Sequence, residues 1–312
     1  MSSDHLIFLE PVFLPKIWGG DRLRTIWGDA VPAGDIGECI TASAHPANDT
    51  RVRDGRYAGV PLSRLWTEHR ELFGGLPGAR FPLQAKVIDA RQDLSVQVHP
   101  GDEYARAHPP AEAKTECWYV LEPGETASIQ IGHHARSREE LAERVAAGQW
   151  SQLLRSVPMA AGDMFLIPAG TAHCILAGTL IYEVMQSSDT TYRLYDYDRT
   201  DESGHKRELH LADALAVIAV PDEPVACAPT THEHAGATET TLVSTDEFTV
   251  TRWIVDGAAR VAVPGAFSVV GVIEGSGEVD GQPVRRGDHF IATAGADSLE
   301  ASGSLTLLVT RP

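Results

Sequence analysis

Residues 162–173, GDMFLIPAGTAH, combine a short apolar run with a tight turn that ends at a histidine. The apolar run MFLI is typical of a short β-strand. Pro168 and Gly170 follow this run, and these two residue types favour a turn in which the chain reverses its direction. We therefore expect the turn to direct His173 into the interior of a β-structure.

The spacing of this stretch, G-x5-P-x-G-x2-H, resembles the second signature of the cupins at every named position. The resemblance implies a jelly-roll-like β-barrel that contains a metal site. The surrounding sequence agrees with such a fold, because residues 6–200 consist mostly of short β-like runs separated by Gly, Pro and Asp turns. We therefore predict a mainly β fold of the cupin type.

Three stretches interrupt the β pattern with helical signals, which predicts a small helical insertion. Residues 61–73 begin with a proline and carry apolar residues at helical spacing. Residues 137–150 open with Ser137 followed by Glu140, which is the spacing of a capping box. A further helix is expected within residues 208–220.

The chain is predicted to contain two β modules. Residues 221–240 are rich in Pro, Thr and Ala without periodicity, which indicates a linker. We therefore predict a catalytic cupin domain over residues 1–220 and a second, smaller β module over residues 241–312. The second module contains a degenerate cupin-like turn, GDHFIATAG, in which His289 falls too early. We expect this module to bind no metal.

Composition limits the possible partners of the protein. The formal net charge of the 312 residues is −17, which argues against binding to nucleic acid or to an anionic membrane. An acidic protein can still bind a small phosphate through a few cations inside a pocket. The sequence contains no apolar run of the roughly 20 residues that cross a bilayer, so a cytoplasmic protein is expected. The oligomeric state stays open, with a monomer favoured.

The four cysteines are scattered along the chain without a CxxC pair. They are Cys39, Cys117, Cys174 and Cys227. Such spacing indicates free thiols in a reducing compartment rather than a disulfide framework or a zinc-thiolate site.

The stretch LSVQVHPGDEYA, residues 94–105, supplies the first half of a candidate metal site. Apolar and polar residues alternate in it, so Gln97 and His99 lie on one face of a strand with about 6.6 Å between their Cα atoms. Glu116 follows in KTECWYV on another predicted strand. Two imidazoles, one carboxylate and one amide oxygen suit zinc or another divalent first-row metal. We expect Gln97, His99, Glu116 and His173 to converge on one ion.

Four other histidines are expected to be ordinary surface residues. His232 and His234 have the spacing of a metal-binding pair, but they lie in the predicted linker. His133 and His134 are interpreted in the same way.

Five segments together resemble the type I mannose-6-phosphate isomerases of the short bacterial form. In chain order they are PVFLPKIWGG (11–20), LSVQVHPGDEYA (94–105), KTECWYVLE (114–122), PAGTAHCI (168–175) and QSSDTTYRLYDYDR (186–199). The resemblance covers roughly residues 11–199 in family order. Beyond residue 200 it depends only on general position and on the second β module.

This resemblance implies a function and a set of site residues. The implied reaction is the reversible interconversion of mannose 6-phosphate and fructose 6-phosphate. The implied ligands of one zinc ion per chain are Gln97, His99, Glu116 and His173. The implied active-site arginine is Arg193, and the residues implied to face the substrate and its phosphate are Lys86, Ser95 and Lys114.

The chemistry of an aldose–ketose exchange fits these residue types. A proton beside a carbonyl is removed through an enediol-type species, so charge develops on the sugar oxygens and requires a metal or fixed cations. Arg193 cannot accept that proton at neutral pH, because the pKa of arginine exceeds about 12. The proton carrier stays open between a metal-activated water, Glu116, Asp196 and Asp198.

Two alternative functions are compatible with a cupin site. An oxygen-using iron oxidoreductase would need only the two histidines and the carboxylate, with Gln97 as a bystander. A non-catalytic sugar-phosphate sensor would use the same pocket without turnover. The sequence does not rank mannose 6-phosphate against other phosphorylated aldoses.

Overall fold

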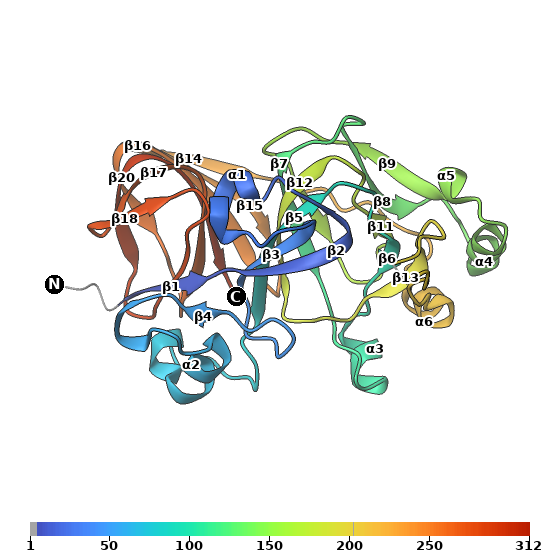
Figure 1. The fold of residues 1–312 in the computed structure, drawn as a ribbon, viewed down its shortest axis with the longest axis horizontal. Coiled ribbons are helices and arrows are strands. Elements are labelled where there is room, and N and C mark those ends of the chain that lie inside the picture. Colours follow the sequence, from blue (N-terminus) through green and yellow to red (C-terminus); the bar gives the residue numbers. More distant parts are fainter. Residues whose placement is uncertain (1–4, 202) are drawn as a thin grey trace.

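The computed structural model describes residues 5–201 and 203–312, and these residues form three β-sheets with short helices at their margins (Figure 1). The six-stranded sheet has the order β10-β7-β12-β5-β2-β3. Its strands are β2 (Val12–Gly20), β3 (Ile36–Ala42), β5 (Leu83–Ala90), β7 (Glu116–Glu122), β10 (Met164–Ile167) and β12 (Thr179–Gln186).

The five-stranded sheet has the order β13-β6-β11-β8-β9. Its strands are β6 (Val96–Val98), β8 (Ser128–His133), β9 (Leu154–Pro158), β11 (His173–Cys174) and β13 (Tyr192–Tyr195).

The six-stranded and five-stranded sheets face each other across a buried apolar layer. Trp118 and Ile181 from the larger sheet meet Ile129 from the smaller one in the same core cluster. The mainly β, cupin-type class predicted from the sequence is therefore confirmed. Within the described residues β3 also pairs with β5, but no strand pairing joins the two sheets, so the predicted barrel is a two-sheet sandwich rather than a closed barrel.

Helices lie in all three stretches where the sequence predicted them and are shorter than predicted, whereas two further short helices, at residues 24–27 and 102–107, were not predicted. The structure contains α1 (Arg24–Trp27), α2 (Leu62–Glu68), α3 (Asp102–Ala107), α4 (Arg138–Ala146), α5 (Trp150–Leu153), α6 (Leu211–Val217) and the 3-10 turns η1 (Gly28–Ala30), η2 (Gly55–Tyr57) and η3 (Arg70–Phe73). Ser137 caps α4, because its Oγ accepts a hydrogen bond of 3.2 Å from the backbone N–H of Glu140. Leu141 and Val145 of α4 and Ala214 of α6 share a core cluster with the five-stranded sheet, which positions these helices beside it (Figure 1).

The third sheet has nine strands and contains the C-terminal module. Its order is β14-β15-β16-β20-β17-β19-β1-β4, with β18 paired to β17. The strands are β1 (Leu6–Glu10), β4 (Arg51–Val52), β14 (Thr230–His234), β15 (Ala237–Ser244), β16 (Thr249–Ala262), β17 (Ser268–Val279), β18 (Gln282–Arg285), β19 (His289–Ala292) and β20 (Ser298–Arg311).

The predicted domain boundaries differ from the structure at two places. β14 lies inside the predicted linker, and because all five of its side chains are exposed, the sequence shows no apolar periodicity there. β1 lies in the predicted catalytic domain, yet it pairs antiparallel with β19, where Phe8 opposes Phe290. Burial of these two phenyl rings, whose centroids are 5.1 Å apart, attaches the first strand to the C-terminal sheet.

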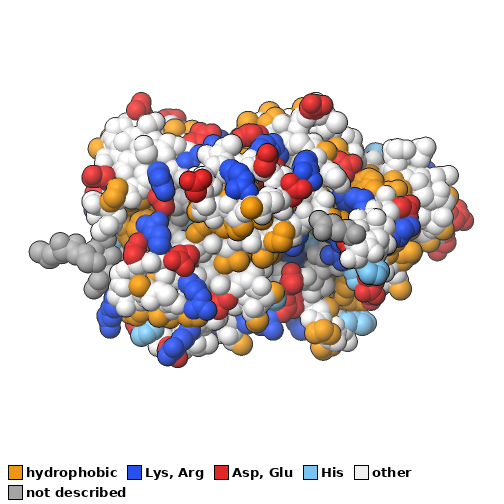
Figure 2. All heavy atoms as spheres, viewed as in Figure 1, with side chains coloured by type: hydrophobic (Ala, Val, Ile, Leu, Met, Phe, Trp, Pro, Cys, Tyr) orange, Lys and Arg blue, Asp and Glu red, His pale blue; other side chains and the backbone are white. Residues whose placement is uncertain are grey.

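The described residues show a surface of mixed charge and free thiols. No helix within residues 5–201 and 203–312 is long and apolar enough to span a membrane. Acidic and basic side chains are interspersed over the face shown in Figure 2. All four cysteines are free, as predicted.

His289 lies at the boundary between the six-stranded sheet and the C-terminal module. Its ring stacks on Tyr182 at a centroid distance of 5.6 Å and on Trp27 at 6.5 Å. Nδ1 lies 2.9 Å from the carbonyl of Gly287, whereas the buried Nε2 has no hydrogen-bond partner among the described residues. Burial lowers the pKa of His289 to about 4, because the charged form has no solvent, although Asp288 opposes this shift.

This depressed pKa predicts an acid-sensitive interface. The folded chain keeps the full contribution of the neutral ring above the ordinary histidine pKa of about 6.5. This contribution is lost progressively as the pH falls from about 6.5 to about 4, because the unfolded chain binds the proton while the buried ring does not. At pH 4.5 the His289→Phe variant, which retains an aromatic ring but cannot titrate, should recover about 2–3 kcal/mol of this loss. Urea unfolding of both chains at pH 7.5 and pH 4.5, with chelator present, measures the difference. Parallel losses in both chains would show that His289 is not the sensor.

Candidate active site

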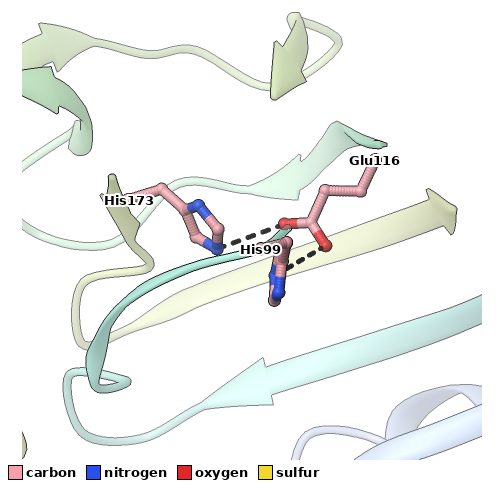
Figure 3. Close-up of side chains that lie close together, drawn as sticks. All are labelled: His99, Glu116 and His173. Carbon is pink, nitrogen blue, oxygen red and sulfur yellow. Dashed lines mark ion pairs between the residues drawn. The ribbon is translucent and has the colours of Figure 1, made fainter. Parts of the chain in front are cut away.

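Three ligand-type side chains from distant parts of the chain meet between the two facing sheets. His99 follows β6, Glu116 begins β7 and His173 begins β11. All three are buried, and their ligand atoms lie within 4.8 Å of one another. Figure 3 shows both imidazoles directed at the carboxylate, with the Nε2 atom of each at 3.4 Å from an oxygen of Glu116. The convergence of these three residues predicted from the sequence is present in the structure.

Backbone carbonyls orient both imidazoles. Nδ1 of His99 lies 2.8 Å from the carbonyl of Thr190, and Nδ1 of His173 lies 2.9 Å from that of Thr171. Each Nδ1–H therefore donates outward, and each Nε2 presents its lone pair to the centre, as in metal-binding histidines. Burial lowers the pKa of His99 to about 3 and also lowers that of His173, so both rings are neutral.

Glu116 is the charged member of this cluster. Burial raises the pKa of Glu116, but the charge of Lys114 outweighs this effect and holds it well below its usual range. Nζ of Lys114 lies 3.0 Å from Oε2 of Glu116. A carboxylate with two neutral imidazoles is the donor set of an open divalent metal site, and Nε2 of His99 has no hydrogen-bond partner in the described chain. These residues therefore fit a metal ion.

Gln97 lies beside this cluster in β6, where it pairs in register with His173. Its amide nitrogen donates to Nε2 of His173 at 3.1 Å, while its Oε1 accepts from Oγ of Ser95 at 3.2 Å. The amide oxygen would face the centre after rotation of the amide by 180°. Gln97 is thus within reach of a metal and is not yet oriented as a ligand.

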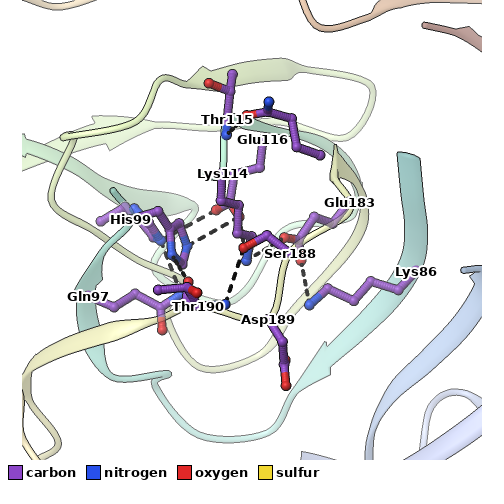
Figure 4. Close-up of polar contacts among 12 residues, drawn as sticks. Lys86, Gln97, His99, Lys114, Thr115, Glu116, Glu183, Ser188, Asp189 and Thr190 are labelled. Carbon is purple, nitrogen blue, oxygen red and sulfur yellow. Dashed lines mark hydrogen bonds and ion pairs between the residues drawn. The ribbon is translucent and has the colours of Figure 1, made fainter. Parts of the chain in front are cut away.

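A cavity of about 350 Å³ opens beside the cluster and contains the remaining predicted site residues. Ser95, Lys86, Lys114 and Arg193 all line it. Both lysines are buried rather than solvated at the surface. Nζ of Lys86 lies 3.2 Å from an oxygen of Glu183, and Nζ of Lys114 lies 3.6 Å from the other oxygen (Figure 4).

Sequence reasoning missed two carboxylates of this cavity, the buried Glu183 in β12 and the half-buried Glu38 in β3. Burial raises the pKa of Glu183 to about 7; Lys86 opposes this shift and Glu116 adds to it. Burial also raises the pKa of Glu38, but Lys86 and Lys16 outweigh it and bring the value to about 2. A charged residue inside an apolar strand, as in TLIYEVMQ, was the signal that could have identified Glu183.

The two aspartates proposed as proton carriers lie elsewhere. Asp196 is buried and accepts hydrogen bonds from Arg199 and Arg207. The side chain of Asp198 is 74% exposed and pairs with Lys206 at 2.6 Å. Neither carboxylate lines the cavity, so the structure does not support either as a proton carrier.

The other histidines match their predicted surface positions with one exception. His134, His232 and His234 are exposed, and Nε2 of His234 lies 2.7 Å from a Glu239 oxygen. His133 is buried, which corrects the prediction, because its Nε2 lies 2.9 Å from the carbonyl of Ala219. That contact joins residues 86 positions apart and is invisible in the sequence.

The fold and the buried His–Glu–His cluster define a cupin-type enzyme site. A family model for the catalytic domain of type I phosphomannose isomerase matches residues 6–134, and one for the mannose-6-phosphate isomerase cupin domain matches residues 238–312. The chain is 42% identical over 308 residues to a mannose-6-phosphate isomerase of Streptococcus mutans, covering 97% of each. It therefore belongs to the type I phosphomannose isomerase family and is an enzyme of that class.

Solved structures support the same assignment. The crystal structure of the mannose 6-phosphate isomerase from Bacillus subtilis is 42% identical and superposes with a TM-score of 0.96, covering 99% of this chain and 100% of that one. A zinc-bound mannose 6-phosphate isomerase, 17% identical, superposes with a TM-score of 0.77 over 98% and 99% of the two chains. The second likeness concerns the fold alone.

Proposed function

We propose that this chain is a zinc-dependent isomerase that interconverts mannose 6-phosphate and fructose 6-phosphate through an enediol-type species. The observation that carries the proposal is the buried cluster of His99, Glu116 and His173 beside a cavity lined by cationic side chains. The family assignment favours an isomerase over an oxygen-using oxidoreductase or a sensor.

His99, Glu116 and His173 would hold one zinc ion, with Gln97 as an oxygen ligand once its amide has rotated. Two neutral imidazoles and one carboxylate are a common ligand set for catalytic zinc. A zinc ion bound there supplies positive charge that stabilises the substrate oxygens while negative charge develops on them. The proposal assigns one such ion to each chain.

The chain itself must move a proton between two neighbouring carbon atoms of the substrate. Lys114 and Glu183 are placed for this role, because both line the cavity and Lys114 contacts the metal ligand Glu116. Glu183 lies between Lys114 and Lys86, so both of its oxygens have a cationic neighbour. We assign proton movement to the pair Lys114 and Glu183.

Arg193 is assigned to charge stabilisation rather than proton transfer. A guanidinium group stays protonated at neutral pH even where burial lowers its pKa, as it does here. β13 pairs with β6 so that Arg193 opposes Gln97. The arginine therefore lies in the strand next to the residues proposed to hold the metal ion. Ser95, buried and bonded to Gln97, would orient that amide and face the sugar.

A metal and activity assay tests this proposal. Purified protein should contain about one zinc per chain and convert mannose 6-phosphate into fructose 6-phosphate. Chelation should abolish turnover, and zinc should restore it better than iron. A panel of other phosphorylated aldoses defines the preference. Zinc-loaded protein that turns over none of these sugar phosphates would refute the proposal.

A further inference from the structure

The carbonyl that orients His99 belongs to a segment without regular secondary structure. Residues 187–191 connect β12 to β13, and Nδ1 of His99 donates to the carbonyl of Thr190 at 2.8 Å. These two residues are 91 positions apart in the sequence. His173 differs, because the carbonyl that it contacts, that of Thr171, lies two residues away in the same turn. The direction of the His99 ring therefore depends on how the 187–191 segment is held.

Three hydrogen bonds hold this segment in a closed ring. Oγ of Ser188 donates to the carbonyl of Glu112 at 3.1 Å and accepts from the backbone N–H of Thr190 at 3.2 Å. The backbone N–H of Glu112 in turn donates to Oγ1 of Thr190 at 2.9 Å. Ser188 is buried, so water does not compete for its hydroxyl. Figure 4 shows Ser188 and Thr190 on the same side of the site as His99.

Glu112 connects this ring to the other half of the metal cluster. It lies four residues before Glu116, in the segment that enters β7. Its side chain adds a contact, because Oε2 of Glu112 accepts from the backbone N–H of Asp189 at 3.3 Å. The ring thus joins the segment that carries Glu116 to the segment that orients His99. Among the described residues, Glu112 and Thr190 do not line the cavity, so these contacts serve the protein rather than a ligand.

A metal-binding histidine needs a fixed acceptor for its second ring N–H, because this hydrogen bond selects the tautomer and the direction of the ring. The acceptor for His99 is the Thr190 carbonyl. No helix or strand ladder includes the described residues 187–191, so side chains must hold this carbonyl in place.

We propose that Ser188 and Thr190 are positioning residues for the metal site. Their hydroxyls hold the Thr190 carbonyl and thereby direct Nε2 of His99 at the ion. Loss of either hydroxyl frees the carbonyl to move and the imidazole to turn with it. This inference rests on the proposed function, because it concerns the metal site assigned there.

Two substitutions each remove one hydroxyl of the ring. Ser188→Ala loses both hydrogen bonds of Oγ, and Thr190→Val keeps the shape of threonine but leaves the N–H of Glu112 without its acceptor. Removal of an outer hydrogen-bond partner of a metal ligand lowers metal affinity about 10- to 100-fold. We expect the zinc dissociation constant, measured by competition with a chromophoric chelator, to rise within this range in both variants. The visible absorption of the Co²⁺-substituted protein should change as well, because the geometry of the ligands changes.

Ser187→Ala and Thr190→Ser are the matched controls. Oγ of Ser187 is buried and has no hydrogen-bond partner within the described chain, so the same change one residue earlier removes no contact. Thr190→Ser keeps the hydroxyl that accepts from Glu112. Both controls should bind zinc within about twofold of the wild-type chain. Urea unfolding of the zinc-free chains compares their stabilities, and if Ser188→Ala does not fold, Thr190→Val decides.

The outcomes separate the inference from the proposed function. Zinc affinities of Ser188→Ala and Thr190→Val that match Ser187→Ala would overturn the inference while the metal site stands. Equal losses in all four variants would indicate general loosening of the segment and would also overturn it. Wild-type protein that binds no zinc would overturn the inference together with the metal site. A loss of zinc affinity confined to Ser188→Ala and Thr190→Val supports the inference even if the wild-type chain turns over no sugar phosphate, and only the isomerase assignment then fails.

Discussion

Replacing Glu116 by glutamine should abolish both the proposed zinc binding and the isomerase activity. The amide has the shape of the carboxylate but no charge, so the cluster would keep only two neutral imidazoles as ligands. Lys114, which now lies 3.0 Å from Glu116, would also repel a cation without the carboxylate between them. We expect zinc content to fall below the detection limit and kcat/KM to fall at least roughly a hundred- to a thousandfold.

Glu122→Gln is the matched control for this prediction. Glu122 ends the same strand, β7, and its side chain is 47% exposed. Metal analysis by mass spectrometry and steady-state kinetics on both variants provide the measurement, and circular dichroism checks that each chain is folded. A Glu116→Gln protein that keeps stoichiometric zinc and normal turnover would contradict the assignment of Glu116 as a ligand.

Glu183→Gln should separate proton transfer from metal binding. Glu183 lies in the cavity between Lys86 and Lys114, and it belongs to no group of residues proposed to hold the ion. Loss of a proton-transferring side chain lowers the rate by roughly a hundred- to ten-thousandfold. We therefore expect kcat to fall within this range, while zinc content and the KM for mannose 6-phosphate change little.

Isotope exchange makes this second prediction specific. If the reaction passes through an enediol-type species, deuterium at carbon 2 of mannose 6-phosphate exchanges with solvent during turnover, and this exchange should slow in parallel with kcat in Glu183→Gln. Glu38→Gln removes the other carboxylate that contacts Lys86 and should lower kcat by less than about tenfold. Loss of zinc from Glu183→Gln would instead show that Glu183 supports the metal site.

The sequence alone was sufficient for the features that depend on neighbouring residues. The alternation of side chains in β6 puts Gln97 and His99 on one face, and the turn before β11 directs His173 into the interior. Both features follow from backbone geometry over a few residues, so they could be predicted. The cap of Ser137 on α4 has the same local origin. The resemblance to the family segments then suggested Glu116 and Arg193 as site residues without any knowledge of the fold, and both line the cavity.

Only the tertiary structure decided which charges pair inside the cavity. Glu183 opposes Lys86 in the register of β12 and β5, although about a hundred residues separate them along the chain. Local patterns contain no information on such a register, so neither the burial of the lysines nor the pairing of Arg207 with Asp196 could be predicted. The pairing of β1 with β19 of the C-terminal sheet could not be predicted for the same reason. Residue types and their local spacing predicted the proposed ligands, and strand pairing over long sequence separations determined the charge balance around them.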